Sequence, residues 1–163
     1  AAALTACSST NEAVNQALIE GAVGGIVAAD CKIGRMTYWA ANATVPVYEI
    51  SFRIVMTNVS SKPVTLSGDN FATTLDGTPI PPFNFSARDV GDADIWRTYD
   101  SLTIRPGEER SVALAYEISQ PTYDSWYKSS RTVAVSFTCG NQRVTYTKNS
   151  RSDEITVSDI ETL

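Results

Sequence analysis

The sequence contains no histidine among its 163 residues. Without an imidazole, the chain cannot form a Ser-His or Cys-His nucleophile pair, a histidine general base or a histidine metal site. No Gly-rich phosphate loop follows a predicted strand. Carboxylates are plentiful, with 18 Asp and Glu residues, but their spacing singles out no acid/base pair. We therefore expect a non-catalytic protein without a cofactor.

Positive charge is also scarce, since 13 Lys and Arg residues face 18 acidic ones and leave a net charge of −5. This balance argues against nucleic acid or an anionic lipid surface as the main partner, although solubility alone would explain it. No apolar run reaches the ~20 residues of a membrane-spanning helix. Internal repeats, low-complexity blocks and interdomain linkers are absent, so the length suits one domain.

Cysteine occurs three times, at Cys7, Cys31 and Cys139. Residues 4–7, Leu-Thr-Ala-Cys, resemble a bacterial lipobox, where an envelope lipoprotein is cut and lipidated at its cysteine. Residues 8–11 are polar and suit a tether. The motif predicts an exported protein, anchored to the membrane through lipid on Cys7 and facing the extracellular space or periplasm. A chance match at an N-terminal thiol is the alternative.

If Cys7 carries lipid, Cys31 and Cys139 remain as an even pair. Oxidation is the default in an exported protein, so we expect a Cys31–Cys139 disulfide. Closing a loop of about 100 residues is worth about 4–5 kcal/mol in the chain-entropy model. Two buried free thiols are the alternative.

The clearest strand lies within residues 45–66, where apolar and polar side chains alternate with a period of two residues. The residues predicted to face the core are Tyr48, Ile50, Phe52, Ile54 and Met56. Turn-forming residues at 58–63 end this strand, and residues 64–66 begin another.

Further short strands follow, separated by turns such as Asp76-Gly77 and Pro106-Gly107. They are predicted at residues 31–38, 71–75, 101–104, 112–118, 133–139, 142–147 and 155–157. We predict loops at residues 84–99 and 120–130, and a short helix at residues 11–20. This pattern predicts an all-β, immunoglobulin-like antiparallel β-sandwich of about seven strands, with a tether that could be partly helical.

Three motifs resemble the telokin-like immunoglobulin-fold domain of secreted bacterial proteins and lipoproteins, whose members include an immunoprotective mycobacterial antigen. They are T-N-x-S-x-K-P-V-T-L at residues 57–66, D-G at 76–77 and P-G-E at 106–108. The resemblance covers about two thirds of the chain and implies fold and export only, because it brings no catalytic residues. We expect a tether at 1–30, a sandwich at 31–148 and a C-terminal strand or tail at 149–163.

Two loops carry the candidate binding residues. Their aromatic side chains, which could form a partner-binding surface or cap the ends of the sandwich, are Trp96, Tyr99, Tyr123, Trp126 and Tyr127. The carboxylates of Asp89, Asp92 and Asp94 are a weak calcium candidate. A solvated acidic loop is the favoured alternative, because the glutamate that ends a calcium-binding loop is missing.

These features support three hypotheses. The first is an interaction module that presents loops or a sheet edge to an unknown protein or surface ligand. The second is a structural subunit of a surface assembly or filament, in which residues 155–160 pair with a neighbouring copy. The third, and least supported, is a carboxylate-based carbohydrate-active enzyme.

Overall fold

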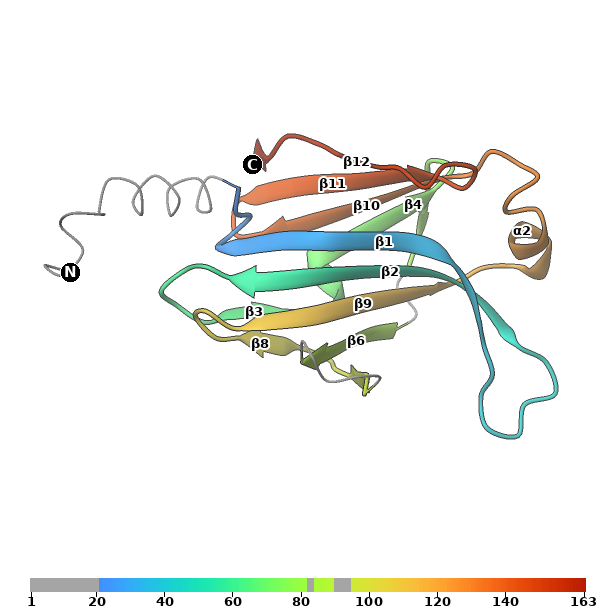
Figure 1. The fold of residues 1–163 in the computed structure, drawn as a ribbon, viewed down its shortest axis with the longest axis horizontal. Helices are drawn as coiled ribbons and strands as arrows, with labels where there is room; N and C mark the ends of the chain where they lie inside the picture. Colours follow the sequence, from blue (N-terminus) through green and yellow to red (C-terminus); the bar gives the residue numbers. More distant parts are fainter. Residues whose placement is uncertain (1–20, 82–83, 90–94) are drawn as a thin grey trace, which may run out of the picture.

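The computed structural model describes residues 21–81, 84–89 and 95–163. These residues form two antiparallel sheets packed face to face, a β-sandwich of immunoglobulin type (Figure 1). The predicted fold class is therefore confirmed. The predicted helix at residues 11–20 and Cys7 lie outside the described residues.

The first sheet has five strands in the order β1-β2-β9-β6-β7. Their bounds are Ile26–Tyr38 (β1), Val47–Asn58 (β2), Asn84–Asp89 (β6), Arg97–Thr98 (β7) and Glu109–Glu117 (β9). β2 faces the core with the side chains that the alternating pattern predicts. Its buried residues, each at most 1% exposed, include Ile50, Phe52, Ile54 and Met56.

The second sheet has six strands in the order β12-β11-β10-β4-β5, with β13 also on β11. Their bounds are Phe71–Leu75 (β4), Thr78–Ile80 (β5), Thr132–Cys139 (β10), Gln142–Asn149 (β11), Ile155–Val157 (β12) and Glu161–Thr162 (β13). A small ladder joins β3 (Val64–Leu66) to β8 (Leu102–Ile104). The short helices are η2 (Gly68–Asn70) and α2 (Gln120–Asp124).

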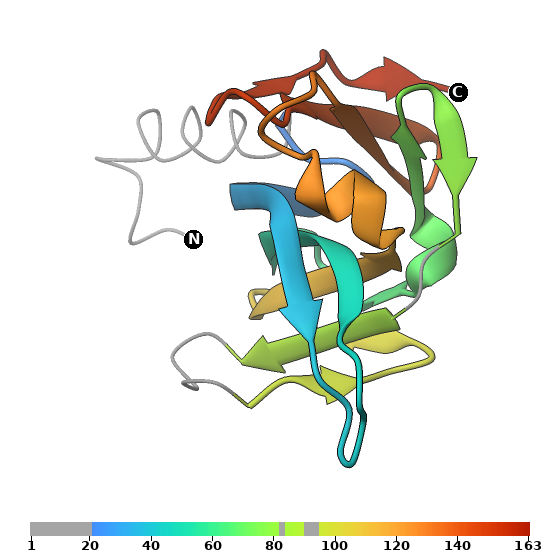
Figure 2. The ribbon, with the colours of Figure 1, turned by 90° about the vertical axis from the view of Figure 1, so that its right-hand side faces the viewer.

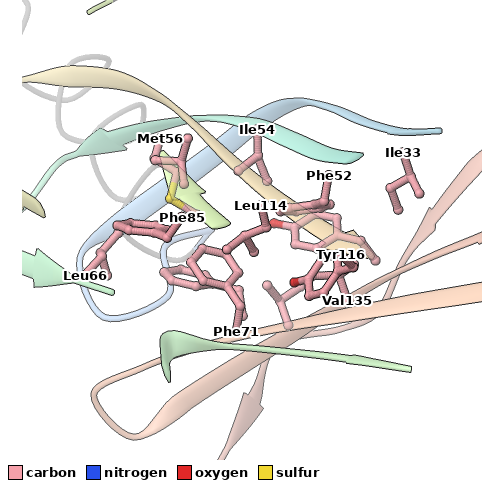
Figure 3. Close-up of a cluster of buried hydrophobic side chains, with 14 of the residues drawn as sticks. Ile33, Phe52, Ile54, Met56, Leu66, Phe71, Phe85, Leu114, Tyr116 and Val135 are labelled. Atoms are coloured by element: carbon pink, nitrogen blue, oxygen red, sulfur yellow. The ribbon is translucent and has the colours of Figure 1, made fainter. Parts of the chain in front are cut away.

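The core fills the space between the two sheets (Figure 3). Its aromatic centre is Phe71, whose ring centroid lies 6.1 Å from that of Phe52 and 5.1 Å from that of Phe137. Val112 and Leu114 of β9 are completely buried. Each large apolar side chain buried here contributes about 1.5–3 kcal/mol to folding, so the alternating strands supply most of the driving force.

The predicted turns are also present. Asp76 and Gly77 have φ angles of +52° and +81° between the paired residues Leu75 and Thr78, as a type I′ hairpin requires. In the turn from Arg105 to Glu108, the Glu108 amide donates to the Arg105 carbonyl oxygen at 2.9 Å. The proline in β5 lies at a sheet edge, where a missing N–H group costs little.

Two loop predictions were wrong. Residues 84–89, predicted as loop, form β6, which pairs with both β9 and β7. Phe85 and Ala87 point into the core from this strand, but four polar neighbours hide the short alternation in the sequence. The predicted loop at 120–130 contains α2, which begins after the N-cap Ser119. The described residues contain thirteen strands rather than the predicted seven or so, and six of the thirteen are only two or three residues long.

The predicted disulfide is not formed, because Cys31 and Cys139 are both free. Cys139 ends β10, where its Sγ lies 3.7 Å from the carbonyl oxygen of Gly24. Cys31 lies in the bulge of β1, between Ala29 and Lys32. Cys139 therefore lies beside Gly24, just before β1 begins at Ile26. At 3.3 Å per residue, Cys31 is about 16 Å further along this strand, whereas a disulfide needs Cα atoms within about 7 Å of each other.

Candidate functional site

The outer face of the five-stranded sheet is hollow because its central residues are small. The register places Ala115 of β9 between Ser51 of β2 and Asn84 of β6. In the adjacent row, Ala113 lies next to Ser86 of β6. Because alternate side chains point to the same face, these five residues form a continuous floor.

Two neighbouring cavities lie at this face, and the larger one opens onto the floor. The larger has a volume of about 540 Å³ and is bounded by Tyr38, Glu49, Arg53, Asn84 and Trp96. The second, of about 480 Å³, also includes Arg53 and Trp96 in its lining. Both volumes fall within the range of about 300–1,000 Å³ that is usual for ligand sites. The larger cavity, together with the floor under it, is the candidate site.

Trp96 separates the two cavities and contacts two arginines. The guanidinium carbon atoms of Arg53 and Arg88 lie 5.3 Å and 5.0 Å from the centroid of its ring. Such cation–π contacts are worth about 0.5–1 kcal/mol each at exposed sites. They hold the Trp96 side chain over the sheet, where it forms one wall of the site.

Glu49 is a buried carboxylate on the outer face. It is only 4% exposed and lies opposite Met36 of β1 and Glu117 of β9. Burial, followed by the charge of Glu117, raises the pKa of Glu49 above its ordinary value. Within the described ranges, Glu49 has neither a hydrogen-bond donor nor a cationic side chain as a partner.

Asn84 supplies a second acceptor that is not used. Its Oδ1 atom is buried and has no hydrogen-bond partner in the described part of the chain. Leaving a buried acceptor unpaired costs about 1–3 kcal/mol, so folded proteins rarely retain one without a reason. Within the described residues the site thus contains one buried acceptor without a partner, Oδ1 of Asn84, and an unpaired carboxylate, that of Glu49.

The structure does not bring the predicted aromatic residues together. Trp96 lies on the outer face, whereas Tyr99 packs against the core and its ring centroid lies 6.0 Å from the guanidinium carbon of Arg110. Trp126 is 1% exposed, so the prediction that it binds a partner was wrong.

The remaining two aromatic residues, Tyr123 and Tyr127, both contact Arg35 at one end of the sandwich. The guanidinium carbon of Arg35 lies 4.3 Å and 4.6 Å from the ring centroids of Tyr123 and Tyr127, and Nη1 donates to the Tyr123 carbonyl oxygen at 2.6 Å. Viewed from that end, α2 lies between the two sheets (Figure 2). The capping interpretation is therefore correct for Tyr123 and Trp126, while Tyr127 is 62% exposed.

The acidic loop gives no calcium site in the described residues. Asp89 forms an ion pair with Arg110, with Oδ1 2.9 Å from Nε. Asp92 and Asp94 lie outside the described residues. No group of three potential metal ligands occurs in the described ranges.

Most of this site could not be predicted from the sequence. The alternation in residues 45–66 puts Glu49, Ser51 and Arg53 on the polar face of the strand, but it does not indicate that Glu49 is buried. The usable signal was in β9, where Ser111, Ala113 and Ala115 alternate with large apolar residues. Three small residues in succession on one face of a central strand indicate a hollow, because sheets normally place larger side chains there.

Comparisons with known proteins assign no activity to the chain. No protein-family model and no curated protein matches the chain. The YjhA protein of Bacillus subtilis is 16% identical with a TM-score of 0.43, over 69% of this chain and 73% of that one.

An uncharacterised β-sandwich protein of Clostridium difficile is also 16% identical, with a TM-score of 0.45, over 76% of this chain and 83% of that one. The YcdA protein of Bacillus subtilis, a suspected lipoprotein, is 9% identical with a TM-score of 0.47, over 80% of this chain and 38% of that one. All three likenesses are too distant to carry an argument about function. Among the described residues, no helix is long and apolar enough to cross a membrane.

Proposed function

We propose that this protein is a non-catalytic binding module of the bacterial cell envelope that holds its ligand on the outer face of its five-stranded sheet. The observation that carries the proposal is the cavity of about 540 Å³ lined by Glu49 and Asn84. In the described part of the chain, the Glu49 carboxylate forms no ion pair and Oδ1 of Asn84 has no hydrogen-bond partner. A cavity with a few convergent polar groups and aromatic walls is the usual form of a ligand site.

The envelope location rests on the sequence. The lipobox-like residues 4–7 and the polar residues after them suit an anchored protein, as does the resemblance to the telokin-like domain. Two acyl chains on Cys7 would suffice for stable anchoring, because a single chain binds membranes only reversibly.

The proposal of a non-catalytic role rests on the missing histidine and on the surroundings of the carboxylates. Glu49 and Glu117 lie opposite each other on paired strands, and this is the observation that favours the enzyme hypothesis. If the protein hydrolysed a saccharide and Glu49→Gln abolished this activity, the enzyme hypothesis would replace the binding hypothesis. We expect the protein to hydrolyse no saccharide.

The proposal of a structural subunit is less well supported. Within residues 155–160, Val157 pairs with Tyr146 of β11 in the same chain. One edge of this segment is therefore already used within the chain, and only its outer edge could pair with a neighbouring copy.

Two measurements test the proposal. Incorporation of radiolabelled fatty acid should be lost in Cys7→Ala and retained in Cys31→Ala. Envelope fragments from cells that lack the protein should bind the parent and Ala72→Phe, which enlarges an exposed residue of the other sheet. They should bind Ala115→Phe, which fills the cavity floor, at least tenfold more weakly. Equal binding of all three proteins would refute the proposed site.

A further inference from the structure

Two groups that line the larger cavity have no partner among the described residues, and both are hydrogen-bond acceptors: the carboxylate of Glu49 and Oδ1 of Asn84. A ligand that satisfies them must donate hydrogen bonds at two separate points. Adjacent strands lie about 4.8 Å apart and residues of one face repeat about every 7 Å, so the Cα atoms of Glu49 and Asn84 are about 12 Å apart. Ala115 also lines the cavity between them.

The charges at the site favour a neutral ligand. Glu49 and Glu117 lie at one end, and Arg53 lies four residues further along β2. Within the described residues, Arg53 forms no ion pair, and its guanidinium group contacts the ring of Trp96. An anion would meet Glu49 and a cation would meet Arg53, whereas a hydroxyl group can donate to the carboxylate and accept from the guanidinium.

The walls provide apolar surface as well. Tyr38 is 49% exposed and borders the same cavity as Trp96. Large amphipathic rings offer contact area at a low cost in side-chain entropy. The floor of Ala113, Ala115 and Ser51 allows a flat ring to approach the sheet.

We propose that the larger cavity binds an uncharged saccharide, with hydroxyl groups donating to Glu49 and Asn84 and a C–H face against Trp96 or Tyr38. This inference rests on the proposed function of the outer face and names its class of ligand. A saccharide brings several donors and acceptors on a rigid ring without net charge, which is what these side chains require together.

The experiment uses saturation-transfer NMR with the purified protein. The saccharide probes are glucose, galactose, N-acetylglucosamine and its β-1,4-linked trimer. Putrescine and inorganic phosphate test the two charged alternatives. We expect at least one saccharide to bind, with affinity about tenfold lower in Asn84→Ala and in Ala115→Phe. Ala72→Phe should stay within twofold of the parent. Circular dichroism confirms that each variant is folded, and Asn84→Ala decides the result if Ala115→Phe is not.

The outcomes separate the two proposals. Binding of putrescine or phosphate alone, lost in Ala115→Phe, would overturn the saccharide and keep the outer face as the site. Saccharide binding that neither Ala115→Phe nor Asn84→Ala weakens would place the sugar elsewhere and also overturn the inference. If no probe binds while envelope fragments still require Ala115, the inference fails and the proposed function stands. If the envelope fragments also bind Ala115→Phe as well as they bind the parent, the inference and the proposed function both fail.

Discussion

The side-chain amide of Asn58 donates a hydrogen bond of 2.9 Å to the carbonyl oxygen of Ile104, which lies 46 residues further along the chain. Nδ2 also donates to the carbonyl oxygen of Lys62 at 2.8 Å. Oδ1 accepts from both the amide and the hydroxyl of Ser60, at 2.9 Å and 2.7 Å. Asn58 is completely buried, so this one side chain joins the end of β2, the following turn and β8.

Replacing Asn58 by Ala should therefore be strongly destabilising. The change leaves two carbonyl oxygens and the Ser60 amide without their partner, and each unpaired buried group costs about 1–3 kcal/mol. Some of these groups will reach water, so we expect a loss of about 2–4 kcal/mol in urea unfolding. Asn141→Ala, at an exposed turn residue, should change stability by less than about 0.5 kcal/mol. Equal effects of the two changes would contradict this account of Asn58.

Arg35→Lys should loosen the end of the sandwich that α2 closes. Lysine keeps the charge but loses the planar group that contacts the rings of Tyr123 and Tyr127. We expect a loss of about 1–2 kcal/mol in thermal unfolding. We also expect faster amide hydrogen exchange in residues 120–130. Arg97→Lys on β7, which is exposed, is the control, and an equal response of both variants would exclude this role for Arg35.

Glu49→Gln should change how stability depends on pH. Burial and the charge of Glu117 raise the pKa of Glu49 above its ordinary 4.5. The native state then holds the proton more tightly than the unfolded state, so stability falls as pH rises through the interval between the two pKa values. The variant should be more stable than the parent at pH 7, and this advantage should disappear below pH 4.5.

The matched control for this change is Glu154→Gln, at an exposed residue. It should follow the parent across the whole range. Chemical unfolding at several pH values makes the comparison, and a constant difference between Glu49→Gln and the parent would show that its carboxyl does not titrate as described.

The two sandwich cysteines should react with iodoacetamide only after unfolding. Burial raises the pKa of Cys31 to about 12, which leaves about one thiolate in 10,000 at pH 8. Cys139 is buried and its pKa is also raised, mainly by desolvation. Peptide mapping without reductant should find both residues alkylated in urea and unmodified in the native protein. Detection of a disulfide-linked Cys31–Cys139 peptide would show instead that the two cysteines are bonded in the native protein.

Deleting residues 153–163 should promote association rather than prevent it. β12 and β13 cover the outer edge of β11, where Thr147 pairs with Thr156 and Arg143 with Glu161. Their removal exposes backbone donors and acceptors, which invite pairing with another chain. Light scattering should show larger species than the parent. Oligomers that are present in the parent and absent from the deletion would instead support an assembly subunit.

The sequence predicted those parts of the fold that depend on local patterns. Phe52 and Val135 lie in long alternating strands. Asp76-Gly77 is one of the few dipeptides that favour a type I′ turn. The failures concern tertiary context. β6 is a strand because β9 and β7 lie on either side of it, and the cysteines are separated by the path of β1 past its bulge.

The candidate site was the least predictable part. The polar identity of Glu49 is visible in the sequence, but its burial depends on Met36 and Glu117, which come from two different strands. Asn84 lay in a segment taken for a loop. Trp96 was noted for its ring, yet its place beside Arg53 and Arg88 follows from the sheet register, which sequence patterns alone do not give.

The hairpin between β1 and β2 projects from the end of the sandwich opposite Gly21, where the described chain begins (Figure 1). It carries Trp39, which is 59% exposed, and Val45, which is 69% exposed. β1 alone spans about 43 Å at 3.3 Å per residue. A domain held through its leading residues would therefore carry these side chains, and the Tyr38 wall beside them, at the end away from its attachment.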